Sequence, residues 1–456
     1  MRNTTYPNLS VSEQKGSFDA VQLLSRYVQF PSVSGNEEAA GRFFAQQCRQ
    51  NGLHLHFFTQ GAGQLNFAAS LYPLDCGKPN IVFLNHIDVV EGGDEAEWLH
   101  PPFSGVISEG FVWGRGAYDN KGLAVMQLYA VSRFVELAKA KDLPYNVTLL
   151  SVSGEEIFSD LGAKQVADFY LQILNPVVVI GEGPVGLKEV IPGNPAQWVF
   201  GISVANKRVL WLNLSLKIKT RGHGSVPPKD HALQSMINAL QRISKIKTPI
   251  KLDDLAYTGM ENMGHLMQNW KGAILKNARR LAYPVKLFLS ADEMLAPFYS
   301  DTILVSTVET EDKAHNIISK KVTAKLDCRL LPQTDTHAFI EMLKIKMKDP
   351  RIQISIEKET PNAMPSDSNH PLYTLLADSV AAEYPGAAVF PMMLPNTSDC
   401  NAFRKKGVPV FSTVPVKMNK ELIDCIHGPN ERIPVAALEE GQRVFVRFLQ
   451  NVFSEA

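Results

Sequence analysis

The sequence contains few cysteines, and their positions argue against two common kinds of site. There are five cysteines among 456 residues. An odd number at irregular spacing is not the even framework of a disulfide-stabilised secreted domain. No two of them form a CxxC pair, which argues against a structural zinc site built from thiolates. From this pattern we predict a reducing, cytoplasmic compartment.

The sequence also has no net charge and no long apolar run. Lys and Arg together number 46, and Asp and Glu together also number 46. This balance gives no overall field that would attract nucleic acid or an anionic membrane, so we expect neither as a partner. No window approaches the roughly 20 apolar residues that span a bilayer. Residues 1–18 are polar and lack the apolar core of a signal peptide.

Two kinds of strand pattern divide the chain. Residues 81–84, 147–153 and 176–180 form mainly apolar runs, which are typical of strands buried on both faces of a parallel sheet. From about Val204 the strands alternate apolar and polar residues instead, as in LWLNLSLKIKT and KVTAKLDCRLLP. That alternation indicates a sheet with one solvent-facing side.

These patterns predict an α/β protein with an inserted α+β domain. The length is large for one hydrophobic core, so two domains are expected. Alternating strands accompanied by two helix patterns favour a ferredoxin-like arrangement. We therefore predict a mixed, mainly parallel sheet domain formed by residues 1–204 and 359–456. Residues 205–358 would form the inserted ferredoxin-like domain.

Three local predictions accompany this fold. Ser34 and Glu37 match the capping-box pattern at the start of a helix. One continuous helix is expected over residues 121–140, because its apolar residues recur at helical spacing. His54 and His56 alternate with apolar residues between polar flanks, and we interpret them as part of a surface strand rather than as a metal-binding pair.

Candidate ligands follow the first buried strand. His86 and Asp88 stand at its end, and residues two apart in a strand point to the same face. Asp88 is therefore placed to contact the ring nitrogen of His86 that a metal leaves free. Asp119 follows in a glycine-rich turn that opens a helix. An imidazole and carboxylates brought together in this way suit a metal cation.

Further carboxylates follow the other buried strands. Glu155 and Glu156 come directly after one strand, and Glu182 ends another. Ligands of an open α/β sheet bind outside the carboxyl ends of its strands, so we expect these side chains to meet His86. His427, held by a following Gly-Pro before the last helix, supplies a second histidine.

The inventory of side chains suits two metal ions. Two zinc ions that share one bridging carboxylate need one histidine and one terminal carboxylate each, and one glutamate then remains as a general base. Such a pair acidifies a metal-bridging water and polarises a carbonyl. Co2+ or Mn2+ could replace Zn2+. Spacing alone does not decide whether Glu155 or Glu156 binds metal.

At this point the chain resembles the M20 family of metallopeptidases over nearly its whole length. The motifs that carry the resemblance are NHIDVV, WLHPPFSGVISEGFVWGRGAYDNKG, SGEE, GEG, RGHGSVP and HGPNERI, in the order of the family. WLHPPFSG, NKRVLWLNL and TSDCNAFRKKG make it most similar to the branch of carboxypeptidase S and the N-acyl-amino-acid hydrolases. The resemblance implies the zinc-peptidase-like catalytic domain, with the inserted domain as a lid and dimerisation module.

The resemblance also implies a role for each ligand. His86 and Glu182 would hold one zinc ion, Glu156 and His427 the other, and Asp119 would bridge them, with Asp88 behind His86. Glu155 would be the general base, exchanging protons between the attacking water and the leaving amine. The peptide bond after Asp119 would be cis.

The substrate-binding residues are likewise implied by the resemblance. His223 in RGHGSVP would stabilise the oxyanion, often from a partner subunit, which predicts a homodimer through the lid domain. Asn316 and Arg329 match positions that receive the substrate carboxylate, for which a guanidinium is a planar, bidentate partner. Asp399, in the TSDC loop, matches a position near the substrate.

We therefore expect a dinuclear zinc hydrolase that cleaves an amide bond beside a free carboxylate. Its substrates would be short peptides, cleaved at the C-terminal residue, or N-acyl amino acids. Glu182 favours this interpretation, because aminopeptidase-like members of the family more often have aspartate there. An aminopeptidase or dipeptidase is the alternative among enzymes. A non-catalytic binding module is the alternative outside them.

Overall fold

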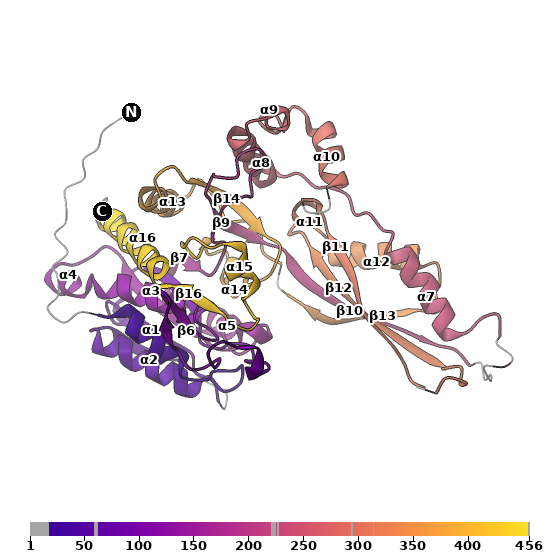
Figure 1. Ribbon diagram of the computed structural model, residues 1–456, viewed down its shortest axis with the longest axis horizontal. Helices are drawn as coiled ribbons and strands as arrows, with labels where there is room; N and C mark the ends of the chain where they lie inside the picture. Colours follow the sequence, from indigo (N-terminus) through magenta and orange to yellow (C-terminus); the bar gives the residue numbers. More distant parts are fainter. Residues whose placement is uncertain are drawn as a thin grey trace.

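A large nine-stranded sheet forms the centre of the larger part of the molecule in the computed structural model (Figure 1), which describes residues 18–58, 63–219, 225, 228–292, 295–312, 314–360 and 362–454. The strand order is β1-β2-β6-β3-β7-β15-β9-β14, with β8 on β9. Its strands are β1 (His54–Phe57), β2 (Phe67–Ser70), β3 (Asn80–His86), β6 (Asn146–Val152), β7 (Pro176–Gly181), β8 (Gly186–Leu187), β9 (Val199–Asn206), β14 (Ala388–Leu394) and β15 (Val410–Ser412).

The middle of this sheet is parallel, as the apolar runs predict. Strand β3 pairs in parallel with both β6 and β7, and β15 continues in parallel on β7. Every residue of β3 and β6 is buried. The outer strands β1 and β2 are antiparallel, so the sheet is mixed. The predicted fold class is confirmed.

Alternate residues of β3 face two helical layers. Ile81 and Phe83 join the larger core, while Val82 and Leu84 join a smaller core on the opposite face. The larger layer contains α1 (Ala20–Val28), α2 (Glu38–Gln50), α3 (Lys121–Ser132), α4 (Val135–Ala140), α13 (Pro371–Glu383), α15 (Lys420–Asp424) and α16 (Val435–Ser454). The smaller layer contains α5 (Ala163–Phe169), α6 (Leu171–Leu174) and α14 (Cys400–Arg404).

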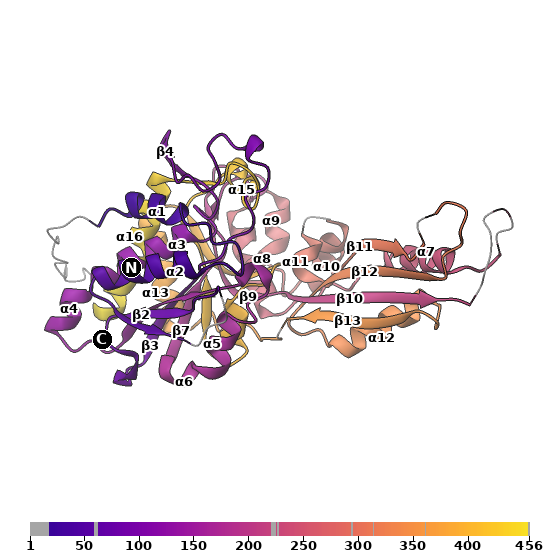
Figure 2. The ribbon, with the colours of Figure 1, turned by 90° about the horizontal axis from the view of Figure 1, so that it is seen from below.

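A separate four-stranded sheet extends away from the large one, and Figure 2 shows it as the narrow arm of an elongated molecule. Its antiparallel strands have the order β11-β12-β10-β13, which is the ferredoxin-like order. Its elements are β10 (Arg208–Lys217), α7 (Ala232–Ile243), β11 (Thr302–Thr310), β12 (Lys321–Leu330), α12 (Thr336–Met347) and β13 (Gln353–Glu359). Only Lys207 separates β9 of the large sheet from β10 of the small one.

Four helices within the range predicted for the inserted domain share a core with the large sheet instead. They are α8 (Asp254–Leu266), α9 (Trp270–Leu275), α10 (Ala282–Ala291) and α11 (Ala296–Tyr299). Their apolar residues pack with Val199 of β9 and Phe390 of β14. No clear helix pattern is visible in this segment of the sequence. The division of the chain at residues 204 and 358 stays a prediction.

A third, small sheet connects the C-terminal part to the glycine-rich turn. Its strands are β4 (Ile107–Ser108), β5 (Phe111–Trp113) and β16 (Arg432–Pro434), and β16 pairs antiparallel with β5. This pairing brings residues 427–431 beside residues 114–120, although more than 300 positions separate them in sequence. Short 3₁₀ helices occur at η1 (Leu74–Cys76), η2 (Glu95–Glu97) and η3 (Glu155–Ile157).

Two of the three local predictions are wrong. Ser34 does not cap α2, because its hydroxyl donates to the carboxylate of Asp88 at 2.8 Å. The predicted single helix over 121–140 is two helices. The hydroxyl of Ser132 donates to the carbonyl of Tyr129 three residues earlier, a local bond that competes with helix continuation.

The surface strand of the third local prediction is confirmed. His54 lies on β1, an edge strand of the large sheet. Within the described ranges, no helix combines the length and apolar character needed to cross a membrane.

Candidate metal centre

The end of strand β3 places His86 at the rim of the large sheet. The imidazole is buried, and its Nε2 lies 3.1 Å from Asp119 Oδ1 and 3.3 Å from Glu182 Oε2. Its Nδ1 lies 3.0 Å from the carbonyl oxygen of Asp88. Nε2 therefore points toward the carboxylates, while Nδ1 is held by the backbone.

Asp88 contacts His86 and also the backbone of the two adjacent glutamates, which the sequence did not predict. Its carboxylate lies 3.6 Å from His86 Nδ1, the predicted nitrogen, and the backbone carbonyl of Asp88 lies closer to the same nitrogen, at 3.0 Å. The carboxylate also accepts the backbone N–H groups of Glu155 at 3.0 Å and Glu156 at 3.1 Å. Being fully buried, Asp88 needs such fixed donors, and they position the two glutamates.

The glycine-rich turn before Asp119 is held by a buried carboxylate, that of Glu431. Glu431 Oε1 accepts the backbone N–H groups of Gly116, Tyr118 and Asp119 at 3.0–3.1 Å. Its Oε2 lies 2.6 Å from the buried guanidinium of Arg115. Four fixed donors thus compensate a charge that would otherwise be costly to bury. They also fix the backbone from which Asp119 projects.

Asp119 lies between the two histidines. Its Oδ1 faces His86, and its Oδ2 lies 3.0 Å from Nε2 of His427. His427 Nε2 is in turn 3.2 Å from Glu156 Oε1. The peptide bond from Asp119 to Asn120 is cis, as the resemblance implies. Two groups of three ligands therefore meet at one carboxylate, with one of its oxygens in each group.

The spacing of these atoms fits metal coordination. Ligand atoms bound tetrahedrally at about 2.0–2.1 Å from a zinc ion lie roughly 3.3 Å apart. The observed distances in the two groups are 3.0–3.3 Å. The buried Glu156 Oε1 has no partner in hydrogen-bond geometry although His427 Nε2 is near it. This geometry is expected when both atoms point toward one metal position rather than toward each other.

The short distances between histidines and carboxylates shift the pKa values of these groups. The carboxylates of Asp119 and Glu156, which lie 3.0 Å and 3.2 Å from Nε2 of His427, raise the pKa of His427 to about 10. Desolvation opposes ionisation of Asp119, yet contacts with His427 and His86 lower the pKa of Asp119 overall. A bound cation would take the place of the histidine protons and release them to solvent, because only neutral imidazole ligates metal.

The structure separates the two adjacent glutamates. Glu156 belongs to the group with Asp119 and His427, whereas Glu155 is grouped with His86 and Glu156 but not with Asp119. Desolvation raises the pKa of Glu155, and the nearby charges of Glu182 and Asp399 raise it further. A carboxyl group with a raised pKa is suited to accept and return a proton.

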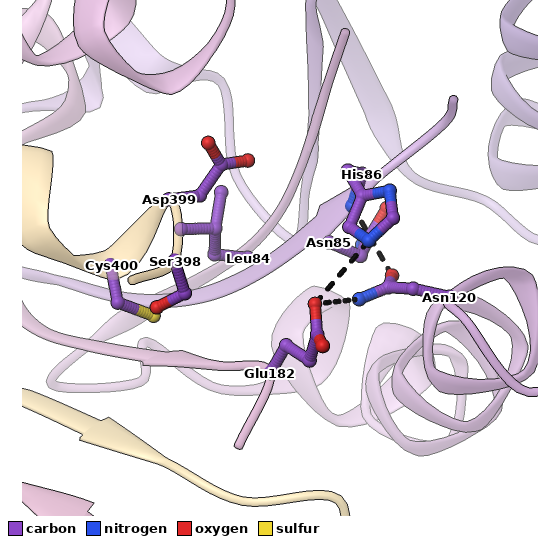
Figure 3. Close-up of a pocket in the computed structure, with 8 residues that line it drawn as sticks. All are labelled: Leu84, Asn85, His86, Asn120, Glu182, Ser398, Asp399 and Cys400. Atoms are coloured by element: carbon purple, nitrogen blue, oxygen red, sulfur yellow. Dashed lines mark hydrogen bonds and ion pairs between the residues drawn. The ribbon is translucent and has the colours of Figure 1, made fainter. Parts of the chain in front are cut away.

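Asn120 and Glu182 form one wall of a small pocket at this rim (Figure 3). Asn120 Nδ2 donates to Glu182 Oε2 at 3.1 Å, and its Oδ1 accepts the backbone N–H of His86 at 3.2 Å. Burial raises the pKa of Glu182, and the charge of Asp119 adds to this. The asparagine therefore connects the ends of β3 and β7 and orients the Glu182 carboxylate.

Asp399 lines the opposite wall of the same pocket, together with Ser398 and Cys400. Ser159 donates to its Oδ1, while its buried Oδ2 has no hydrogen-bond partner. Burial raises the pKa of Asp399 to about 7. Asp399 thus lies near the metal centre, but its predicted part in substrate binding stays a prediction.

The other predicted substrate-binding residues lie apart from these ligand groups. Arg329 is on β12 opposite Val209, at the end of the small sheet that adjoins the large one, and its guanidinium makes a bidentate pair with Asp327 at 2.9 Å. Asn316 is exposed in the segment after β11. His223 lies outside the described residues. Their roles stay predictions.

Sequence reasoning missed the residues that support the ligands. Glu431 and Arg115 lie inside HGPNERI and WGRGAYDN, and a charged residue within a glycine-rich motif beside a ligand was the available signal. Nothing in the spacing indicated that these two side chains pair across the molecule. Only the pairing of β16 with β5 brings them together.

This fold and site define a class of protein. A mixed α/β sheet whose rim gathers histidines and carboxylates around a shared aspartate, with a spare glutamate, is the arrangement of a metal-dependent hydrolase. Residues 82–451 match peptidase family M20/M25/M40, and the chain belongs to this family. It is a metallo-hydrolase acting on amide bonds.

Individual relatives agree with this assignment. The chain is 25% identical over 467 residues to the mouse N-fatty-acyl-amino acid synthase/hydrolase PM20D1, covering 98% of this chain and 85% of the relative. It is 22% identical to a probable carboxypeptidase S-like 2 from Dictyostelium discoideum, covering 83% and 72%. The crystal structure of the M20 family metallo-carboxypeptidase Sso-CP2 from Sulfolobus solfataricus shares the fold, with a TM-score of 0.71, 19% identity, and 96% and 100% coverage.

Proposed function

We propose that the protein is a dinuclear zinc hydrolase that cleaves an amide bond next to a free carboxylate. The observation that carries the proposal is the position of Asp119, whose two carboxylate oxygens each face a different histidine. A mononuclear site needs no such shared ligand. His86 and Glu182 would hold one ion, Glu156 and His427 the other, and Asp119 both.

Bound zinc ions would supply Lewis acidity, lowering the pKa of a water and polarising the scissile carbonyl. The chain's own residues do the rest. Glu155, held through its backbone by Asp88, would take a proton from the attacking water and deliver it to the leaving amine. Glu431 would keep the Asp119 turn rigid, so that the ligands need not rearrange during turnover.

The proposed substrates are N-acyl amino acids and short peptides with a free C-terminus. Two relatives support this class, since one bears the name of an N-fatty-acyl-amino acid synthase/hydrolase and the other that of a carboxypeptidase. Arg329 would release the carboxylate of Asp327 and bind the substrate carboxylate in its place. Both carboxylates are planar and can accept the same two N–H groups of the guanidinium. We further propose a homodimer through the small sheet domain.

A substrate panel tests the proposal with the zinc-loaded protein. An N-acyl dipeptide and an N-acyl amino acid, each with a free carboxylate, should be hydrolysed. The matching C-terminal amides should react at least about 100-fold more slowly, because a site built for a charged partner is then left unpaired. Comparable rates on acid and amide would contradict the carboxylate requirement. Hydrolysis of unblocked peptides only would identify an aminopeptidase or dipeptidase.

Metal analysis supplies the second arm. The purified protein should bind two zinc ions per chain and lose activity when a chelator removes them. Two bound ions without turnover on any amide, with Glu155 intact, would indicate a binding module instead. One bound ion at saturation would contradict the dinuclear site.

A further inference from the structure

The helices between the two sheets expose a surface whose charge departs from that of the whole chain. Residues 270–291 contain five basic residues and no acidic one, although the full chain has equal numbers of both. Figure 1 shows α9 and α10, which make up most of this segment, in an outer layer beyond β9 and β14. A balanced total therefore conceals a local excess of positive charge.

The same segment exposes large apolar side chains. Trp270 is 70% exposed, Tyr283 is 75% exposed and Leu287 is 55% exposed. Tyr283 and Leu287 are four residues apart on α10 and so share one face of that helix. The opposite face, with Val285 and Leu289, is buried against α8 and the large sheet. Each face of α10 is thus partly apolar, and only one of them is covered.

A basic side chain of α9 lies over an aromatic ring of α10. Lys271 Nζ is 5.6 Å from the ring centroid of Phe288, which places the start of α9 beside the last turn of α10. Within the described part of the chain, Arg279 is paired with Asp254 and Glu261 on α8, whereas no ion pair to Lys271 or Lys286 is found. These lysines remain available to an external anion.

We propose that this surface, made of Trp270, Lys271, Arg280, Tyr283, Lys286 and Leu287, binds the protein reversibly to the surface of an anionic lipid bilayer. Tryptophan and tyrosine favour the interface because one end of each side chain is apolar and the other polar. Lysine and arginine chains extend past apolar neighbours to reach headgroup phosphates. A cationic surface with exposed aromatic and leucine side chains is the pattern of a peripheral membrane anchor.

The combination distinguishes a bilayer from other anionic partners. Nucleic acid would take the basic residues but leave Leu287 and the apolar part of Trp270 in water. A bilayer satisfies both, since its headgroups are anionic and its acyl boundary is apolar. This inference does not depend on the proposed substrate, because it concerns a surface outside the metal centre. It replaces the expectation, drawn from net charge, that no membrane is a partner.

Vesicle sedimentation with the full-length protein tests the proposal. The protein should bind phosphatidylcholine vesicles that contain phosphatidylglycerol, bind pure phosphatidylcholine vesicles far less, and be released by salt. Lys271→Gln combined with Lys286→Gln should lower the partition coefficient roughly 25-fold, because each basic side chain near an anionic surface contributes a factor of about five. Trp270→Ala should lower it as well, and Trp270 fluorescence should be quenched by brominated lipid.

The matched control lies on α12, where Ile345 is 72% exposed beside Lys346. Ile345→Ala combined with Lys346→Gln removes a similar exposed apolar group and a lysine from a distant helix, and should leave binding unchanged. An equal loss in this control would overturn the proposal, as would equal binding to neutral and anionic vesicles. Binding to duplex DNA or heparin without binding to vesicles would overturn it too.

Discussion

Charged side chains at the rim of the large sheet differ in burial and in bonding partners from Arg329 and Asp327 on the small sheet. At the rim, Asp88 and Glu431 are buried, and each is surrounded by fixed donors, mostly backbone N–H groups. On the small sheet, Arg329 and Asp327 pair within one strand and remain about one quarter to one third exposed. A buried charge without its donors costs several kcal/mol, whereas an exposed pair is exchanged for water at little cost. The geometry of the charged groups is therefore fixed at the rim and adjustable at Arg329.

The largest effect should come from the ligand shared by both metal groups. Asp119→Asn removes the charge between His86 and His427, so zinc affinity should fall more than about 100-fold and activity should fall to background. Metal content by mass spectrometry and hydrolysis rates measure this. The control Asp378→Asn changes an exposed aspartate on α13 and should retain two ions. Full metal content in Asp119→Asn would contradict the shared site.

The adjacent glutamates offer a comparison within the rim. Glu155→Gln should lower kcat by about 10²–10⁴-fold while leaving zinc content unchanged, because it removes proton transfer and no ligand. Glu156→Gln should instead lower zinc content, since Glu156 lies beside His427. Kinetics and metal analysis of the same preparations separate the two. If Glu155→Gln loses zinc while Glu156→Gln keeps it, the assigned roles are reversed.

A smaller effect is expected behind the ligands. Glu431→Gln should weaken zinc binding by roughly 10–100-fold, because the turn that carries Asp119 loses its charged acceptor. It should also lower the free energy of unfolding by about 3 kcal/mol, since Arg115 is left buried without its partner. Hydrogen exchange at Gly116 and Asp119 should speed up.

Glu421→Gln is the control for that substitution. It removes the exposed carboxylate on α15 that pairs with Arg432, the residue after Glu431. Zinc affinity and amide exchange should stay as they were, because the backbone N–H groups of the Asp119 turn keep Glu431 as their acceptor. Equal effects of the two substitutions would show that the buried carboxylate has no special part in holding the turn.

The smallest effect should occur on the small sheet. Arg329→Gln should raise KM about tenfold for substrates with a free carboxylate, because one charge-assisted contact is lost. The free energy of unfolding should change by less than about 1 kcal/mol, as for other exposed ion pairs. Arg351→Gln removes a more exposed arginine, paired with Asp230 and Asp349, and should not alter KM. An unchanged KM in Arg329→Gln would leave the carboxylate without its proposed partner.

Strong local patterns made most of the fold predictable. Continuous apolar runs fit strands buried on both faces, as in β3, β6 and β7. Alternating residues fit strands buried on one face, as in β10 and β12. Helices α9 and α11 were missed because six and four residues are too few to show a helical period. The buried residues of α8 to α11 pack on one another and on the large sheet. The capping box failed because Asp88, distant in sequence, offered Ser34 a stronger acceptor.

The candidate site divides in the same way. Position at a strand end selected His86 and Glu182 as candidates, and position in a glycine-rich turn or beside Gly-Pro selected Asp119 and His427. The structure brings all four together with Glu156. Which of the two glutamates faces Asp119 depended on side-chain direction in the turn after β6. The cytoplasmic compartment, the dimer and the role of His223 stay predictions.

By itself the sequence determined which side chains could serve as ligands, because each follows a buried strand or stands in a turn that glycine or proline residues mark. Tertiary structure alone decided how they are held. Glu431 reaches the Asp119 turn only because β16 pairs with β5. Which faces of α9 and α10 are exposed depends on which of their residues pack in the core shared with the large sheet. Contacts between distant segments are set by packing, which no local pattern encodes.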